Sequence, residues 1–99
     1  MSKSILQPDR SRCYLCGGFE CGDHLDKHHV FGGANRPLSE KYGLYVYLHH
    51  GSCHIFGKYA AHNDENTMLS LRQSAQKTAM DTYGWAEEDF RRIFGKNYL

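Results

Sequence analysis

Cysteine and histidine are confined to one stretch of this chain of 99 residues. All four cysteines and all seven histidines lie between Cys13 and His62, so these fifty residues hold eleven side chains that could ligate a metal. Structural disulfides are disfavoured in a reducing cytosol, and the first residues contain no hydrophobic segment long enough for a signal peptide. Metal binding therefore explains the cluster better than a disulfide framework does.

The length and composition fit one small soluble domain. Hydrophobic residues make up 40% of the sequence and charged residues 23%, and twelve Lys and Arg against eleven Asp and Glu give a formal charge of +1. This balance provides no strongly basic overall field of the kind that attracts nucleic acids. No apolar run approaches the roughly 20 residues of a membrane span, so we expect a cytoplasmic protein without membrane contact.

The residue pattern predicts an α+β fold. Residues 1–12 are polar and are expected to form a flexible arm, followed by a single domain over residues 13–99. Strands are expected over residues 26–31 and 44–48, separated by a loop with one helical turn at residues 39–42. Asn63 or Asp64 caps a predicted helix that ends at Gly84, and a second helix is expected over residues 86–94. The expected architecture is a small finger of two strands and a helix, with zinc knuckles and two C-terminal helices.

Two pairs of closely spaced ligands predict a structural zinc site. Cys13 and Cys16 have the spacing by which one tight turn presents two thiolates to an ion, and His50 and Cys53 repeat that spacing further along the chain. Together these residues would form a closed Cys3His tetrahedron, the arrangement typical of structural Zn2+. Such a site would supply much of the folding free energy of so small a domain.

Two alternatives for this site stay open at the level of the sequence. His49 replaces His50 as the ligand if the preceding strand ends one residue differently. Cys21 and His24 form a further pair with the same spacing and could displace the distal pair. The Gly-Ser pair at residues 51–52 favours the distal knuckle, which would leave Cys21 as a free thiol or an occasional ligand.

The remaining histidines predict a second centre. His28, His54 and His62 can converge on one ion as neutral imidazole ligands. His29 points elsewhere, because successive residues of a strand face opposite sides. An imidazole that faces solvent beside a metal without binding it suits a general base, since its ordinary pKa lies near physiological pH.

The order of these motifs resembles the HNH nuclease superfamily, also called the His-Me finger or ββα-metal superfamily. The resemblance lies in His28-His29-Val30, the following Gly32-Gly33, and a strand that runs into His50-x2-Cys53-His54. Residues 29–44 and the C-terminal segment 94–99 resemble small HNH-like proteins of phages and prophages. The resemblance therefore covers most of the chain.

The resemblance implies roles for individual residues. The three histidines of the second centre would hold a catalytic divalent metal (Mg2+, Mn2+ or Zn2+), and His29 would be the general base. The Asn of the family motif has no clean match, because Gly43 stands where it usually lies, and Asn35 is the nearest candidate for orienting His29. Two cations beside the site could stabilise charge on substrate phosphate oxygens, namely Arg36 and Lys41.

The implied function is a metal-dependent HNH-type endonuclease that hydrolyses phosphodiester bonds of DNA through backbone contacts. The low net charge predicts weak, salt-sensitive binding unless a partner protein delivers the DNA, and exposed aromatics such as Tyr45, Tyr47 or Tyr98 could support a homodimer. If phage-encoded, the protein would act in the host cytoplasm. The motifs do not distinguish DNA from RNA, or nicking from double-strand cutting. The rival function is a non-catalytic zinc-binding module that docks protein or nucleic acid, which the unmatched Asn favours.

Overall fold

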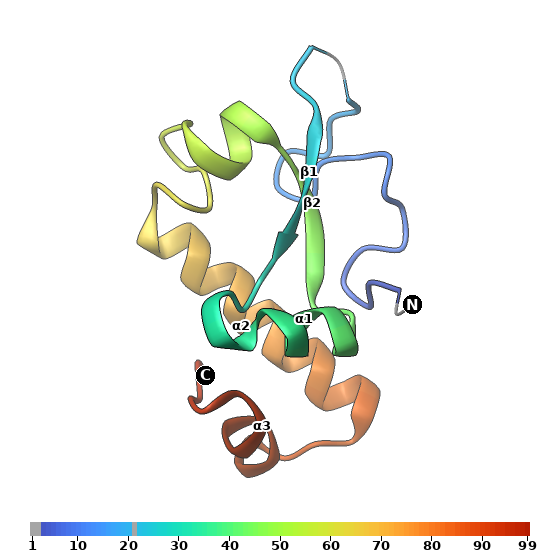
Figure 1. Ribbon diagram of the computed structural model, residues 1–99, viewed down its shortest axis with the longest axis vertical. Coiled ribbons are helices and arrows are strands. Elements are labelled where there is room, and N and C mark those ends of the chain that lie inside the picture. The colour runs from blue at the N-terminus through green and yellow to red at the C-terminus, as the bar shows by residue number, and fades with distance from the viewer. Residues whose placement is uncertain (1–2, 21) are drawn as a thin grey trace.

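The computed structural model describes residues 3–20 and 22–99 and has the predicted mixture of a small sheet and helices (Figure 1). Cys21, for which a role as free thiol or ligand was considered, lies outside the described residues. The elements in chain order are β1 (Leu25–His29), a 3-10 turn (Gly33–Asn35), α1 (Arg36–Tyr42), β2 (Tyr45–His49), a π-helical turn (His50–Ile55), α2 (Glu65–Tyr83) and α3 (Glu87–Phe94). Figure 1 shows the antiparallel β1–β2 hairpin in one half of the elongated molecule and α3 at the opposite end. Within the described ranges, no helix is both long enough and apolar enough to span a bilayer.

The register of the hairpin decides which histidines share a face. His28 pairs with Val46, and His29 pairs with Tyr45. Directly opposed residues of an antiparallel pair project from the same face of the sheet. His28 therefore projects toward the core with the fully buried Val46, whereas His29 projects to the other face beside the Tyr45 ring. The two adjacent histidines thus serve opposite faces of the hairpin, as strand alternation predicts.

Both strands are displaced from their predicted bounds. β1 starts at Leu25 and ends at His29, before Val30 and Phe31, whose side chains are buried. The N–H of Val30 still donates to the carbonyl oxygen of Leu44 at 3.1 Å. The N–H of Phe31 donates instead to the Ser39 hydroxyl at 3.0 Å. β2 runs one residue later than expected, so that His49 is its last residue.

The two C-terminal helices are confirmed, and the predicted helical turn is a full helix. α2 follows the N-cap Asp64 and ends at Gly84, whose φ of 68° is a left-handed conformation that glycine adopts without steric cost. α3 ends in the same way before Gly95. α1 has seven residues rather than one turn, and Pro37 in its first turn favours a helix start because its φ is already helical.

A hydrophobic core joins the strands to the helices. Phe31, just beyond β1, has its ring centroid 5.4 Å from that of Phe90 and 4.9 Å from that of Phe94, both on α3. Burying a side chain of this size stabilises a fold by about 1.5–3 kcal/mol. α2 contributes small and branched side chains to the same core: Leu71, Ala75 and Ala79. This packing fixes the end of β1, where the two adjacent histidines lie.

The N-terminal segment, expected to be a flexible arm, lies along β2 in its described part. The Ser4 hydroxyl donates to the carbonyl oxygen of Tyr45 at 2.5 Å, and the Tyr47 N–H donates to Gln7 Oε1 at 2.8 Å. Tyr45 is only 5% exposed. The expectation that Tyr45 is an exposed aromatic available to a homodimer is therefore wrong.

Candidate metal centres and general base

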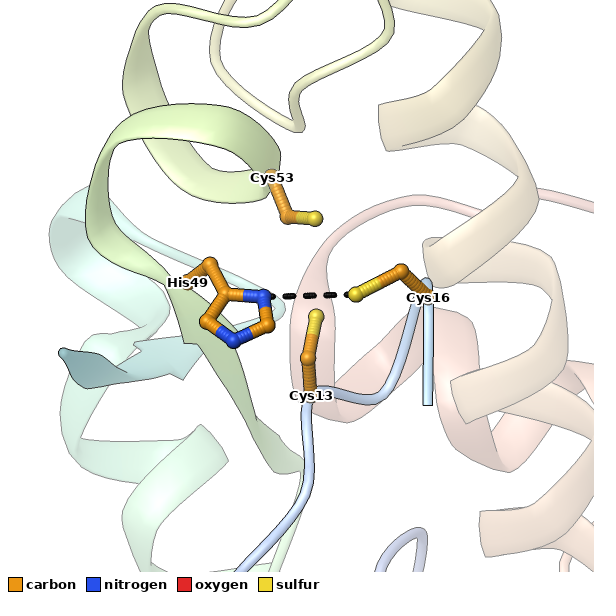
Figure 2. Close-up of side chains that lie close together, drawn as sticks. All are labelled: Cys13, Cys16, His49 and Cys53. Carbon is orange, nitrogen blue, oxygen red and sulfur yellow. Dashed lines mark hydrogen bonds between the residues drawn. The ribbon is translucent and has the colours of Figure 1, made fainter. Parts of the chain in front are cut away.

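Three cysteines and one histidine gather beside the end of β2 (Figure 2). The ligand atoms of Cys13, Cys16, His49 and Cys53 all lie within 4.8 Å of one another. The first two come from the N-terminal knuckle, His49 ends β2, and Cys53 lies in the π-helical turn. Figure 2 shows the three sulfur atoms and the Nδ1 of His49 pointing toward a common centre. This arrangement fits the closed Cys3His geometry of structural zinc.

The histidine of this group is His49, so the preference for His50 was wrong. Because β2 ends one residue later than expected, His49 is still a strand residue, and His50 projects to another side, with its Nδ1 2.6 Å from Asp26 Oδ2. The Nε2–H of His49 donates to the carbonyl oxygen of Phe19 at 3.0 Å. This bond leaves Nδ1, 3.2 Å from Cys16 Sγ, as the ligand nitrogen.

Local hydrogen bonds shape the two turns that carry these ligands. The N–H of Gly17, at a φ of 75°, donates to the carbonyl oxygen of Cys13 at 2.8 Å and closes the first knuckle. The second turn is tied to Asp23, whose carboxylate accepts from the N–H groups of Gly51 at 2.8 Å and Ser52 at 3.0 Å. These hydrogen bonds lower the pKa of Asp23 to about 2, so the turn is held by an ionised carboxylate at neutral pH.

Burial and backbone hydrogen bonds set the thiol pKa values in this group. Burial raises the pKa of Cys53 to about 12. Burial also opposes ionisation of Cys13, but backbone hydrogen bonds from Cys16 and His49 outweigh it and lower the pKa of Cys13 to about 7. A Cys3His site needs every thiol deprotonated. A zinc ion at the centre would supply the positive charge that favours the thiolates.

A second group brings His28, His54 and His62 together, with all ligand atoms within 4.8 Å. The ring centroids are 5.0 Å apart for His28 and His54, 5.1 Å for His28 and His62, and 4.8 Å for His54 and His62. Zn–N bonds of about 2.0–2.1 Å around a tetrahedral ion would place imidazole centroids about 5 Å apart. The rings that the sequence analysis assigned to the catalytic ion therefore have the separation that one ion requires.

A tight return of the chain brings His62 back to His54. The N–H of His62 donates to the carbonyl oxygen of His54 at 2.9 Å, although α2 has not yet begun. Gly57 lies at the turn of this loop, where a Cβ would be 1.9 Å from the carbonyl oxygen of Ser52. The return therefore requires glycine at this position.

His28 forms the buried end of this cluster, and His62 forms its exposed rim. His28 is 3% exposed, and its Nε2 has no hydrogen-bond partner within the described part of the chain. Burial, together with His54 and His62 nearby, lowers the pKa of His28 to about 3, so the imidazole stays neutral. A buried nitrogen without a partner costs about 1–3 kcal/mol, and neutral imidazole is the form that binds metals. The donor set thus fits a divalent cation with an open side for a further ligand.

Asp26, which the sequence analysis did not assign, orients His54. Its Oδ2 accepts from the Nδ1–H of His54 at 2.9 Å, which leaves Nε2 available to an ion. Burial raises the pKa of Asp26, but hydrogen bonds from His54 and His50 outweigh it and lower the pKa. A carboxylate in this role fixes the tautomer of a ligating histidine and raises its basicity. Asp26 precedes His28 by two residues in β1, so the alternation of strand residues predicts that the two side chains project from the same face.

His29, on the opposite face of the hairpin, is held by Glu40 of α1. The His29 Nε2 lies 2.9 Å from Glu40 Oε1, which also pairs with the Lys27 Nζ at 2.7 Å. The hydrogen bonds from Lys27 and His29 lower the pKa of Glu40. Because the ionised carboxylate accepts, Nε2 carries the proton and Nδ1 is the basic nitrogen of His29. The His29 side chain is only 11% exposed, so the expectation that it faces solvent is wrong.

Other predicted site residues occupy different places. The side-chain amide of Asn35 donates to the carbonyl oxygen of Phe94 at 2.8 Å and so ties the 3-10 turn to the end of α3. Glu40, rather than Asn35, therefore supplies the orienting hydrogen bond found for His29. Arg36 and Lys41 are exposed on α1, the helix that carries Glu40.

A groove of about 990 Å³ lies on the His29 face of the hairpin. Lys27 Nζ lies 4.0 Å from the centroid of the Tyr45 ring, and the guanidinium of Arg10 lies 5.7 Å from that of the Tyr47 ring. The groove therefore combines cations and aromatic rings beside the His29–Glu40 pair. The cations, tyrosines and carboxylate that line it are Lys3, Arg10, Lys27, Glu40, Tyr45 and Tyr47.

Comparisons of the chain with protein-family models, with curated proteins and with solved structures found no match.

Proposed function

We propose that the protein is a metal-dependent nuclease of the HNH type that hydrolyses phosphodiester bonds of DNA. The observation that carries the proposal is the three-histidine cluster around the unpartnered buried nitrogen of His28, next in the chain to a histidine held by a carboxylate. Metal-assisted hydrolysis requires a cation site and a general base close together. The motif order that resembles the HNH superfamily, with β1, β2 and α2 as its ββα-metal finger, supports the same function.

His29 is the proposed general base. Glu40 holds the Nε2–H of His29, so Nδ1 can accept a proton from an attacking water, and the carboxylate then stabilises the imidazolium. The ion pair with Lys27 keeps Glu40 ionised for this task. A divalent ion held by the three histidines would polarise the scissile phosphate and stabilise the leaving oxygen. Asp26 keeps one of those ligands, His54, in position.

The groove on the His29 face is the proposed path of the DNA backbone. Its cations, Lys3, Arg10 and Lys27, suit phosphate contacts. Because His28 and His29 project to opposite faces, the scissile phosphate must lie across the end of β1. The charge of His29 contributes to the lowered pKa of His28, so the two rings are within electrostatic reach of each other. Arg36 and Lys41 on α1 would contact phosphates further along the DNA strand.

Cleavage of a supercoiled plasmid tests the nuclease proposal. With Mg2+ or Mn2+, wild-type protein is expected to cut, and His29→Ala is expected to lose about 10²- to 10⁴-fold in rate because the general base is removed. Glu88→Gln, an exposed change on α3, is the control that keeps wild-type activity. Wild-type protein that never cuts, or His29→Ala that cuts equally well, would contradict the proposal.

The second candidate is a non-catalytic zinc-binding module. The observation that favours it is the 11% exposure of the His29 side chain, which restricts access of water to the base. If the protein is such a module, wild type and His29→Ala would bind DNA in the groove with equal affinity, and neither would cut it. A gel-shift titration beside the cleavage assay therefore separates the two functions.

A structural Zn2+ is the proposed occupant of the Cys13, Cys16, His49 and Cys53 group. Elemental analysis after mild purification is expected to find about one tightly held zinc per chain, because apparent zinc affinities of about 10–16 kcal/mol contribute directly to folding in small domains. Cys13→Ser is expected to lose the helical circular dichroism signal, whereas His29→Ala keeps it. A folded preparation without zinc, or equal loss of signal in both variants, would refute this assignment.

A further inference from the structure

A further group of potential ligands lies beside the three-histidine cluster and consists of His24, Asp26 and His50. The Nε2 of His24 lies 3.0 Å from Asp26 Oδ1, and the Nδ1 of His50 lies 2.6 Å from Asp26 Oδ2. The two imidazoles thus engage different oxygens of one carboxylate. Their rings stack with centroids 4.7 Å apart and an interplanar angle of 21°.

The backbone holds these side chains in place. The N–H of His50 donates to the carbonyl oxygen of His24 at 2.8 Å, immediately beyond the Leu25–His49 pair at the end of the hairpin ladder. Asp26 is the next residue of β1 and pairs with Leu48. Asp26 lies on a strand, and the hydrogen bond between His50 and His24 holds their backbones beside it, so the three side chains start from fixed backbone positions.

We propose that His24, Asp26 and His50 bind a further divalent transition-metal ion, in addition to those proposed at the Cys3His group and the three-histidine cluster, with Zn2+ as the reference ion. Two imidazoles and a carboxylate form a donor set suited to Zn2+, Cu2+ and Ni2+ rather than to Mg2+ or Ca2+. Metal–ligand bonds of about 2.0–2.2 Å around a tetrahedral ion place neighbouring ligand atoms about 3.4 Å apart. The ligand atoms of these three residues all lie within 4.8 Å of one another, so small side-chain shifts suffice to surround an ion. His24 is exposed and the other two are half-buried, so water can complete the coordination. We call this group the outer site and the cluster of His28, His54 and His62 the inner site.

Asp26 connects the outer site to the inner site. Its Oδ2 accepts from the Nδ1–H of His54 at 2.9 Å, and His54 belongs to the inner site. An ion at the outer site withdraws charge from the carboxylate and weakens the hydrogen bond that orients His54. Two cations on either side of one carboxylate also repel each other. Occupation of the outer site therefore lowers the affinity of the inner site for its metal ion, and excess zinc slows the proposed cleavage of DNA. This coupling rests on the proposed inner metal, whereas the outer site does not.

Calorimetric titration of Zn2+ tests the outer site in protein whose Cys3His group is already filled. Wild type is expected to bind two further ions, and His24→Gln and His50→Gln are each expected to bind one. His29→Gln is the matched control, because it replaces a histidine outside both sites and is expected to bind two. Circular dichroism establishes that each variant is folded. The outer site is overturned if His24→Gln and His50→Gln each bind as many ions as wild type. A wild type that binds one further ion, with none bound by these two variants, would instead contradict the inner site.

The coupling has its own readout, because its effect must be reciprocal between the two sites. His62→Ala removes an exposed ligand of the inner site without touching Asp26. In this variant the outer site is expected to bind Zn2+ at least about fivefold more tightly than in wild type, at the lower end of ordinary coupling factors. An unchanged affinity would overturn the coupling. None of these measurements uses DNA cleavage, so their outcome is independent of whether the protein is a nuclease.

Discussion

Glu40 on α1 reaches the end of β1, where its Oε1 lies 2.9 Å from the Nε2 of His29. The carboxylate fixes which nitrogen of the imidazole carries the proton. It also lies where charge would develop if His29 accepted a proton. The hydrogen-bond partner found for His29 is therefore an ionised carboxylate rather than the amide of Asn35, which the resemblance to HNH proteins implied.

Replacement of Glu40 by Gln is expected to slow plasmid cleavage by about 10- to 100-fold, the usual cost of losing a supporting carboxylate. Gln keeps the size of the side chain but removes the charge that stabilises an imidazolium. Zinc content and helical circular dichroism are expected to match wild type, and Glu88→Gln serves as the control on an exposed helix position. Cleavage by Glu40→Gln at the wild-type rate would show that the pair has no role in the reaction.

Short-range patterns in the sequence suffice for several parts of this structure. The spacing of Cys13 and Cys16 predicts the first knuckle, because a tight turn depends on a few neighbouring residues. The alternation of apolar and aromatic residues before His49 predicts β2, and Gly84 predicts the end of α2. Asp26 could also have been assigned, since it shares a strand face with His28.

Other parts depend on contacts between distant segments. The choice between His49 and His50 follows from the residue at which β2 ends, and a shift of one residue turns every side chain of a strand to the other face. Glu40 lies 11 residues from His29 on a helix whose approach to β1 is a tertiary contact. No local pattern around Glu40 distinguishes it from an ordinary exposed glutamate.

Replacement of His28 by Leu is expected to raise the free energy of unfolding by about 1–3 kcal/mol when no ion is present at the inner site. The variant removes a buried nitrogen that has no hydrogen-bond partner among the described residues, and it places an apolar side chain in the core instead. Urea unfolding of protein with zinc at the cysteines measures the difference. The same variant is expected to lose the inner ion and plasmid cleavage. A destabilised His28→Leu would show that the nitrogen is satisfied in the folded protein.

The pH dependence of stability follows from the same residue. The pKa of His28 falls from 6.5 to about 3 on folding, so between these values the unfolded chain binds a proton that the folded protein does not. Stability is therefore lost as the pH falls below 6.5. Urea unfolding of wild type without an inner ion is expected to show a steeper loss between pH 6.5 and 5 than that of His28→Leu. Parallel curves for the two proteins would contradict the burial of this imidazole.

Replacement of Gly57 by Ala is expected to destabilise the protein by roughly 2–3 kcal/mol, because the new Cβ would overlap the carbonyl oxygen of Ser52. The loop that returns His62 to His54 would be displaced, so affinity at the inner site is expected to fall as well. Gly32→Ala is the matched control, since a Cβ there meets no atom of the described residues within 4 Å and its φ is −93°. Equal thermal stability of the two variants would show that the return does not need glycine.

The most direct test of whether the imidazoles of the inner site hold an ion is anomalous diffraction. It uses crystals of protein that has zinc at the Cys3His group, soaked in Co2+. A cobalt peak is expected about 2.0–2.2 Å from one nitrogen each of His28, His54 and His62, with His29 still bound to Glu40. Three rings without a cobalt peak between them, or a cobalt ion ligated by His29, would contradict this expectation.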